Sequence, residues 1–125
     1  MDDNSTTISQ LKDSIAAFTE ERDWKQFHSP KNLGMSIAIE AAELMEHFQW
    51  ITQEDSQKID DAKRHEVGEE LADVICYCVA LANSMNIDIA QAFEKKMARN
   101  REKYPAEQFK GFYGHDDPQY VRRDD

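Results

Sequence analysis

The stretch from Val74 to Ala82 limits the fold of this chain most strongly, because it is uninterrupted by any charged residue, glycine or proline. It lies within a helix expected from about Ala62 to Met85. A helix that is apolar on every face is expected to be buried on every face, and the run is far shorter than the roughly 20 apolar residues of a membrane span. A chain of 125 residues has little left with which to enclose it. We therefore expect a second subunit to cover part of this helix.

Three more helices are predicted from residue pairs typical of helix starts, namely Thr7 with Gln10, Ser29 with Pro30, and Asp88 with Gln91. The second helix is expected to continue towards Trp50, and the fourth to end before Pro105. Four glycines and three prolines are too few for a turn-rich sandwich or barrel. The predicted fold is all-α, an antiparallel four-helix bundle that oligomerises through its helical core.

The chain is predicted to hold one domain, at residues 7–110, between an N-terminal tail (1–6) and a C-terminal tail (111–125). Its 25 acidic and 15 basic side chains give a net charge of −10, which argues against a nucleic acid polymer as partner. No segment is long and apolar enough for a membrane, and the acidic N-terminus is unlike a signal peptide. The two cysteines, Cys76 and Cys78, are expected to be small core residues. The predicted location is the cytoplasm.

Two acidic pairs stand in apolar surroundings, Glu40 with Glu43 and Glu70 with Asp73. Members of each pair are three residues apart and therefore share one helix face. Two carboxylates about 5 Å apart repel by roughly 3 kcal/mol at an effective dielectric constant near 20. Such a cluster must be neutralised, either by protonation or by a divalent cation, for which oxygen ligands favour Mg²⁺ or Mn²⁺. The alternative is a pair of solvated, salt-bridged helix faces.

His47 follows Glu43 by four residues and shares its face, so it is either a further ligand or a histidine that is hydrogen-bonded or at the surface. A di-iron bundle would need two Glu-x-x-His pairs, and no histidine here lies three residues after a glutamate. The sequence therefore favours an all-carboxylate site.

Basic and aromatic residues complete the candidate site. Lys96, Asn100 and Lys103 share a face of the fourth helix and could bind a triphosphate, although a helix C-terminus is often basic in any case. Trp24 and Trp50 flank the helix that carries Glu40 and Glu43. Their rings could stack on a base, or could simply contribute to the core.

Four segments in combination resemble the MazG-like all-α nucleotide pyrophosphohydrolases, and most closely their dCTP pyrophosphatase branch: ERDWKQFH (21–28), EAAELMEHFQW (40–50), EELADVICY (69–77) and KMARNREKYP (96–105). The resemblance covers roughly residues 7 to 110. Two positions depart from it. His47 stands where the dCTP branch usually has an aliphatic residue, and Ile15 where some members have a pocket histidine.

The resemblance implies Mg²⁺-dependent hydrolysis of a nucleoside triphosphate, dCTP or a modified dCTP, to the monophosphate and pyrophosphate, as in nucleotide-pool sanitation. It also implies a homo-oligomer, either a dimer or a tetramer. The residue roles it implies are metal binding by Glu40, Glu43, Glu70 and Asp73; phosphate contacts from Lys96, Asn100, Lys103 and Tyr104; and a base and sugar pocket of Trp24, His28, Trp50 and Tyr77. Glu43 or Glu70 would act as the base, with Lys96 as a further catalytic group. The alternatives are an all-α enzyme that hydrolyses dUTP and a non-catalytic helical module that binds metal or nucleotide.

Overall fold

The computed structural model of the chain describes residues 1–111, and these residues are helical without any strand. The elements are α1 (Ile8–Glu21), the 3-10 helix η1 (Lys25–Phe27), α2 (Pro30–Glu46), α3 (Gln53–Ser56), α4 (Asp61–Met85), α5 (Ile89–Lys103) and α6 (Ala106–Phe109). The prediction of an all-α fold is confirmed. Residues 1–87 form one compact unit, and α5 and α6 belong to a second unit that begins at Asp88.

The predicted helix starts are present, with side chains that cap the first turns. Thr7 and Gln10 form a complete capping box, in which the Thr7 hydroxyl accepts from the Gln10 N–H at 3.2 Å and Gln10 Oε1 accepts from the Thr7 N–H at 2.7 Å. Ser29 Oγ accepts from the Asn32 N–H at 3.2 Å. Asp88 caps α5 in the same way, at 2.8 Å from the Gln91 N–H. Each cap satisfies a backbone donor that has no partner within its helix.

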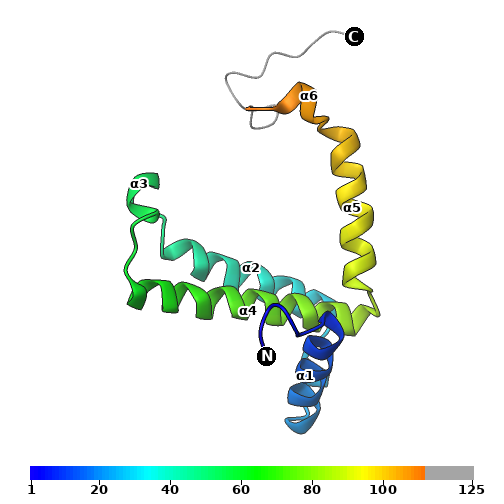
Figure 1. Cartoon of the computed structure of the whole chain (residues 1–125). Coiled ribbons are helices and arrows are strands. Elements are labelled where there is room, and N and C mark those ends of the chain that lie inside the picture. The colour runs from blue at the N-terminus through cyan, green and yellow to red at the C-terminus, as the bar shows by residue number, and fades with distance from the viewer. Residues whose placement is uncertain (112–125) are drawn as a thin grey trace. The chain divides into compact units, whose positions relative to one another are not determined.

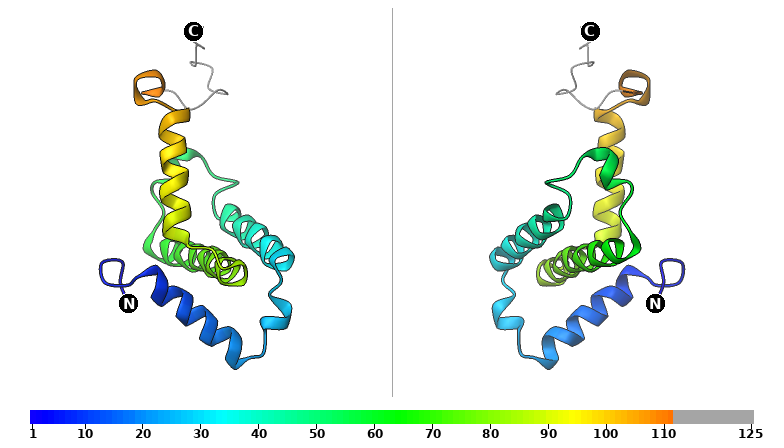
Figure 2. Two further views of the ribbon diagram at one scale, coloured as in Figure 1. Left: turned by 90° about the vertical axis from the view of Figure 1, so that its right-hand side faces the viewer. Right: turned by 90° about the vertical axis from the view of Figure 1, so that its left-hand side faces the viewer.

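The first unit is built on α4. Helix α2 runs antiparallel beside it, and α1 also packs on α4 (Figures 1 and 2). The small core of this unit comprises Leu33, Val79, Ala80 and Ala82. Polar contacts attach the first helix to the end of α4, since Asn83 Nδ2 donates to the Lys12 carbonyl at 3.0 Å and Lys12 Nζ to the Ile87 carbonyl at 2.5 Å.

The run from Val74 to Ala82 is only partly buried within this single chain; its covering by a second subunit stays a prediction. Val79, Ala80 and Ala82 are buried, but Ile75 is 46% exposed. Cys76 and Cys78 are exposed as well, so their assignment to the core was wrong for the isolated chain. The reason is geometric, because α1 and α2 cover only part of the circumference of α4.

The end of α2 differs from the sequence prediction, and the end of α4 has a cap that the sequence analysis did not identify. Helix α2 ends at Glu46, with His47 as its C-cap, so Trp50 lies in the following turn and is 86% exposed. Helix α4 ends at Met85 as predicted, and its C-cap Asn86 adopts the left-handed conformation with φ 51° and ψ 48°. Asparagine is one of the few residues that tolerate this conformation, and it lets the chain leave the helix sharply.

Helix α5 keeps its predicted bounds and stops two residues before Pro105. The bundling of all four long helices, and the single domain over residues 7–110, stay predictions. The C-terminal tail predicted at 111–125 lies outside the described residues except for Gly111. No single helix within residues 1–111 is long and apolar enough to cross a membrane; by length and composition alone, α4 and α5 together would pass as a bent pair.

Candidate metal and nucleotide site

Three glutamates converge where α2 and α4 run side by side. Glu40 and Glu43 come from α2, and Glu70 comes from α4. One carboxylate oxygen from each lies within 4.8 Å of the others. The i, i+3 spacing places Glu40 and Glu43 on one face, and the packing of the two helices turns that face towards Glu70.

Burial and mutual repulsion raise the pKa values of two of these carboxyl groups. Desolvation raises the pKa of Glu40 to about 7, with help from a hydrogen bond to Glu43 and from the charges of Glu43, Asp73 and Glu70. Desolvation, a hydrogen bond to Glu43 and nearby negative charge also raise the pKa of Glu70, while His47 opposes this rise. Oε2 of Glu40 and Oε2 of Glu70 are buried and accept no hydrogen bond.

This donor set fits a divalent cation with a preference for oxygen. Buried polar atoms in folded proteins are nearly always paired, so two unpaired carboxylate oxygens within one cluster require an explanation. A cation such as Mg²⁺ or Mn²⁺ would supply the missing partner and would offset the repulsion that raises the pKa values. Glu40, Glu43 and Glu70 could each donate one oxygen to it.

Asp73, the fourth acidic residue of the sequence prediction, lies at the edge of this cluster. Its charge contributes to the raised pKa values of Glu40 and Glu70, but its oxygens are outside the group of three. It also raises the pKa of the Cys76 thiol, after the larger effect of burial. Tyr77, one turn further along α4, is half-buried.

The candidate phosphate-binding residues lie in the second unit. Lys96, Asn100 and Lys103 line an open pocket of about 440 Å³ on α5 together with Arg99 and Glu102. Tyr104 is the C-cap of the helix, and its ring meets Phe109 edge-to-face at 5.1 Å. The sequence prediction that these residues share a surface is therefore supported for Lys96, Asn100 and Lys103.

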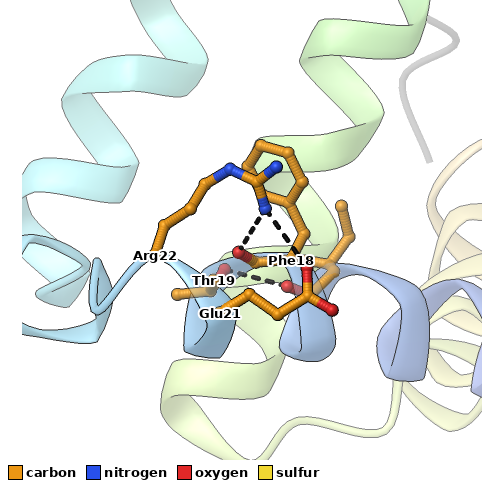
Figure 3. Close-up of polar contacts among 5 residues, drawn as sticks. Phe18, Thr19, Glu21 and Arg22 are labelled. Carbon is orange, nitrogen blue, oxygen red and sulfur yellow. Dashed lines mark hydrogen bonds and ion pairs between the residues drawn. The ribbon is translucent and has the colours of Figure 1, made fainter.

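The candidate pocket residue Trp24 is held at the end of α1 by side chains that the sequence did not single out for the site. The Phe18 ring meets Trp24 edge-to-face at 5.6 Å. The Arg22 guanidinium lies 3.8 Å from the centroid of the Phe18 ring, and its Nη1 donates to the Phe18 carbonyl at 3.0 Å and pairs with Glu21 at 3.4 Å (Figure 3). Trp24 itself is 44% exposed, so part of its ring remains available for contact.

His28 and Trp50, the other aromatic candidates, differ in their surroundings. His28 is half-buried and ends the 3-10 helix, and its carbonyl accepts from Ser84 Oγ at 3.3 Å. Trp50 is almost fully exposed beyond α2. The grouping of Trp24, His28, Trp50 and Tyr77 into one base and sugar pocket stays a prediction.

His47 has a charged partner that the sequence reasoning did not assign. Its Nδ1 lies 4.0 Å from Oε2 of Glu66 on α4. The spacing in the sequence could have indicated this contact, because His47 follows Glu43 by four residues and Glu66 precedes Glu70 by four. The antiparallel packing of α2 and α4 brings the two together.

Comparison with known proteins agrees with the resemblance seen in the sequence. A family model for the MazG-like family matches residues 35–113. The chain belongs to the MazG-like family. The three clustered glutamates, Glu40, Glu43 and Glu70, all lie within the segment that the family model matches.

Similar proteins include dCTP pyrophosphatase 1 from Mus musculus, 40% identical over 107 residues, and from Homo sapiens, 41% identical over 102 residues. These matches cover 84% and 80% of this chain, but 63% and 60% of the two mammalian proteins. The chain thus spans less than two thirds of the length of these curated relatives. A crystal structure of a pyrophosphatase from Archaeoglobus fulgidus is similar at 36% identity with a TM-score of 0.76, covering 84% of this chain and 98% of the archaeal one.

Proposed function

We propose that this MazG-like chain is a nucleoside triphosphate pyrophosphohydrolase that uses Mg²⁺, with Mn²⁺ as a substitute. The observation that carries the proposal is the convergence of Glu40, Glu43 and Glu70 within 4.8 Å, with a buried unpaired oxygen on two of them. The similarity to proteins named dCTP pyrophosphatase 1 supports dCTP or a modified dCTP as the substrate, with the monophosphate and pyrophosphate as products.

Glu40, Glu43, Glu70 and Asp73 would hold the cation, which when bound neutralises phosphate charge and orients a water molecule. With a pKa of about 7, Glu40 is partly protonated near neutral pH in the metal-free chain, and cation binding would displace that proton. Glu43 or Glu70 would accept a proton from the attacking water.

The phosphates would be bound by α5. Lys96 offsets the charge that develops on the phosphate groups, with Asn100, Lys103 and Tyr104 as further contacts. Trp24, His28, Trp50 and Tyr77 would form the base and sugar pocket, in which the flat rings stack on the base. Phe18 restricts the orientation of Trp24 by direct ring contact, and Arg22 lies over the Phe18 ring.

A homo-oligomer, either a dimer or a tetramer, is part of the proposal. Large apolar side chains that a stable protein would normally cover are exposed on one chain, namely Met35, Ile39, Met45, Leu71 and Ile75. They belong to α2 and α4, so a second copy that packs on these helices would also complete the burial predicted for residues 74–82. The cytoplasmic location and the domain limits 7–110 are proposed on the sequence alone.

The test is pyrophosphate release from a panel of canonical and modified deoxynucleoside triphosphates, with Mg²⁺ and with a chelator. We expect turnover that requires the cation and is lost in Glu40→Gln and Asp73→Asn. A competition between dCTP and dUTP in one reaction separates the two substrate hypotheses. A non-catalytic module would instead bind nucleotide or metal without forming product, in both the unaltered chain and the variants.

A further inference from the structure

A contact between His47, the C-cap of α2, and Glu66 on α4 lies close to the three glutamates. His47 Nδ1 lies 4.0 Å from Glu66 Oε2. The other ion pairs within residues 1–111 connect residues no more than four apart in sequence. In the part of the chain that the structure describes, His47 and Glu66 therefore form the one contact between a basic and an acidic side chain that links α2 and its C-cap to α4.

The pair lies one helical turn from the carboxylate cluster on both helices. His47 follows Glu43 by four residues, and Glu66 precedes Glu70 by four. Because α2 and α4 run antiparallel, both steps lead in the same direction along the helix pair. The His47–Glu66 contact thus lies at the end of the cluster where α2 finishes.

Burial distinguishes the two partners. The His47 side chain is 16% exposed, whereas that of Glu66 is 57% exposed. Lys63 Nζ contacts the same Glu66 oxygen at 3.4 Å, so Glu66 is held on its own helix and then reaches across to His47. The histidine is therefore the more buried partner of this contact.

We propose that His47, held by Glu66, is a positioning residue for the carboxylate site: its ring sets the spacing of α2 and α4 one turn from Glu43 and Glu70, and so the spacing at which these carboxylates receive a divalent cation. The inference rests on the proposed metal-binding role of the glutamates. His47 acts through the spacing of the helices and is not itself a ligand.

A charge effect alone would give a different pattern of mutational results. Removal of Glu66 takes away a negative charge and would weaken cation binding, whereas removal of His47 would strengthen it or leave it unchanged. A positioning role predicts instead that both truncations weaken binding, because either one loosens the same contact. The sign of the His47→Ala effect therefore separates the two explanations.

The experiment is calorimetric titration of the full chain with Mg²⁺, and separately with Mn²⁺, in the absence of nucleotide. We expect His47→Ala and Glu66→Ala each to weaken cation binding on the order of 3- to 10-fold. The double variant should bind at most about 2-fold more weakly than the weaker of the two single variants, because the two residues act through one contact. His47→Gln, which retains a polar side chain of similar reach, should recover part of the affinity.

His65→Ala is the matched control. His65 Nε2 lies only 3.2 Å from Glu69 Oε1, but both residues are on α4 and are exposed, at 78% and 67%. The variant should bind the cation as the unaltered chain does. If circular dichroism shows that His47→Ala does not fold, His47→Gln and Glu66→Gln replace the alanine variants. Both should then weaken cation binding, by smaller factors.

Tighter or unchanged binding in His47→Ala, or additive losses in the double variant, would overturn the positioning role while leaving the metal site intact. If the unaltered chain binds neither cation, this inference and the proposed function fail together. If it binds the cation but forms no product, the proposed function fails and the positioning role is still decided by the same binding measurements on the variants.

Discussion

Replacement of Glu40 by glutamine is expected to stabilise the metal-free protein above neutral pH. The pKa of Glu40 is raised to about 7 by burial, by its hydrogen bond with Glu43 and by neighbouring negative charges. A carboxyl group whose pKa is higher in the folded than in the unfolded chain contributes stability below the unfolded value, and this contribution is lost as the pH rises through the folded value. Glutamine keeps the shape of the side chain and carries no charge at any pH.

The size of the effect follows from the geometry of the cluster. Two carboxylate charges 4.8 Å apart repel by about 3.5 kcal/mol at an effective dielectric constant of 20 and by about 0.9 kcal/mol in bulk water. Glu40 is half-buried and Glu43 is exposed, so water screens their charges. The repulsion energy therefore lies towards the lower of these two values. A gain of about 1 kcal/mol corresponds to a rise in Tm of roughly 3–6 °C for a chain of this length.

The assay is thermal unfolding in the presence of a chelator between pH 5 and pH 8. The Tm of Glu40→Gln should lie above that of the unaltered chain at pH 8, and the two should approach each other towards pH 5, where Glu40 is protonated. Mg²⁺ should then raise the Tm of the unaltered chain, because it binds the folded state, and should raise that of the variant much less.

Glu46→Gln serves as the control, because Glu46 is an exposed residue of the same helix and its replacement changes the net charge equally. The reasoning is refuted if Glu40→Gln melts at or below the unaltered chain at pH 8, or if the difference does not depend on pH. An equal gain in Glu46→Gln would attribute the effect to net charge and not to the cluster.

Three further outcomes are expected. Lys96→Ala should lower kcat/KM for nucleotide hydrolysis by on the order of 10²-fold through lost charge stabilisation, whereas Lys95→Ala, which is outside the α5 pocket, should leave steady-state kinetics near the unaltered values. Trp50→Ala should raise KM by roughly 5- to 100-fold, as expected for a lost base stack, with little change in Tm because the side chain is 86% exposed. Asn86→Ala should lower the free energy of unfolding by about 1 kcal/mol in urea denaturation, while Asn86→Gly should not, because residue 86 has a positive φ.

Helix positions were predictable because their causes are local. The hydroxyl of Thr7 and the carboxylate of Asp88 each bond a backbone N–H three residues later, so residue type and spacing suffice. The end of α2 was predicted less well. Apolar residues continue the helical pattern as far as Trp50, whereas the backbone leaves the helix after Glu46.

The candidate site was predictable as to which acidic residues take part, but not as to how they meet. The spacing of Glu40 and Glu43 places them on one face of a helix, yet the approach of Glu70 depends on how α2 packs on α4. Asp73 shows the limit of spacing alone, since it shares the face of Glu70 but remains outside the group of three. The pairing of His47 with Glu66 depends on the same packing.

The sequence by itself determined the helices, their caps and the placement of Glu40, Glu43 and Glu70 on helices among apolar residues. These features follow from contacts within one or two helical turns. The tertiary structure decided which oxygens lose water and lack a partner, and which part of the run at residues 74–82 is covered. Burial and pKa depend on atoms brought close from distant parts of the chain, and that proximity arises only when the helices pack.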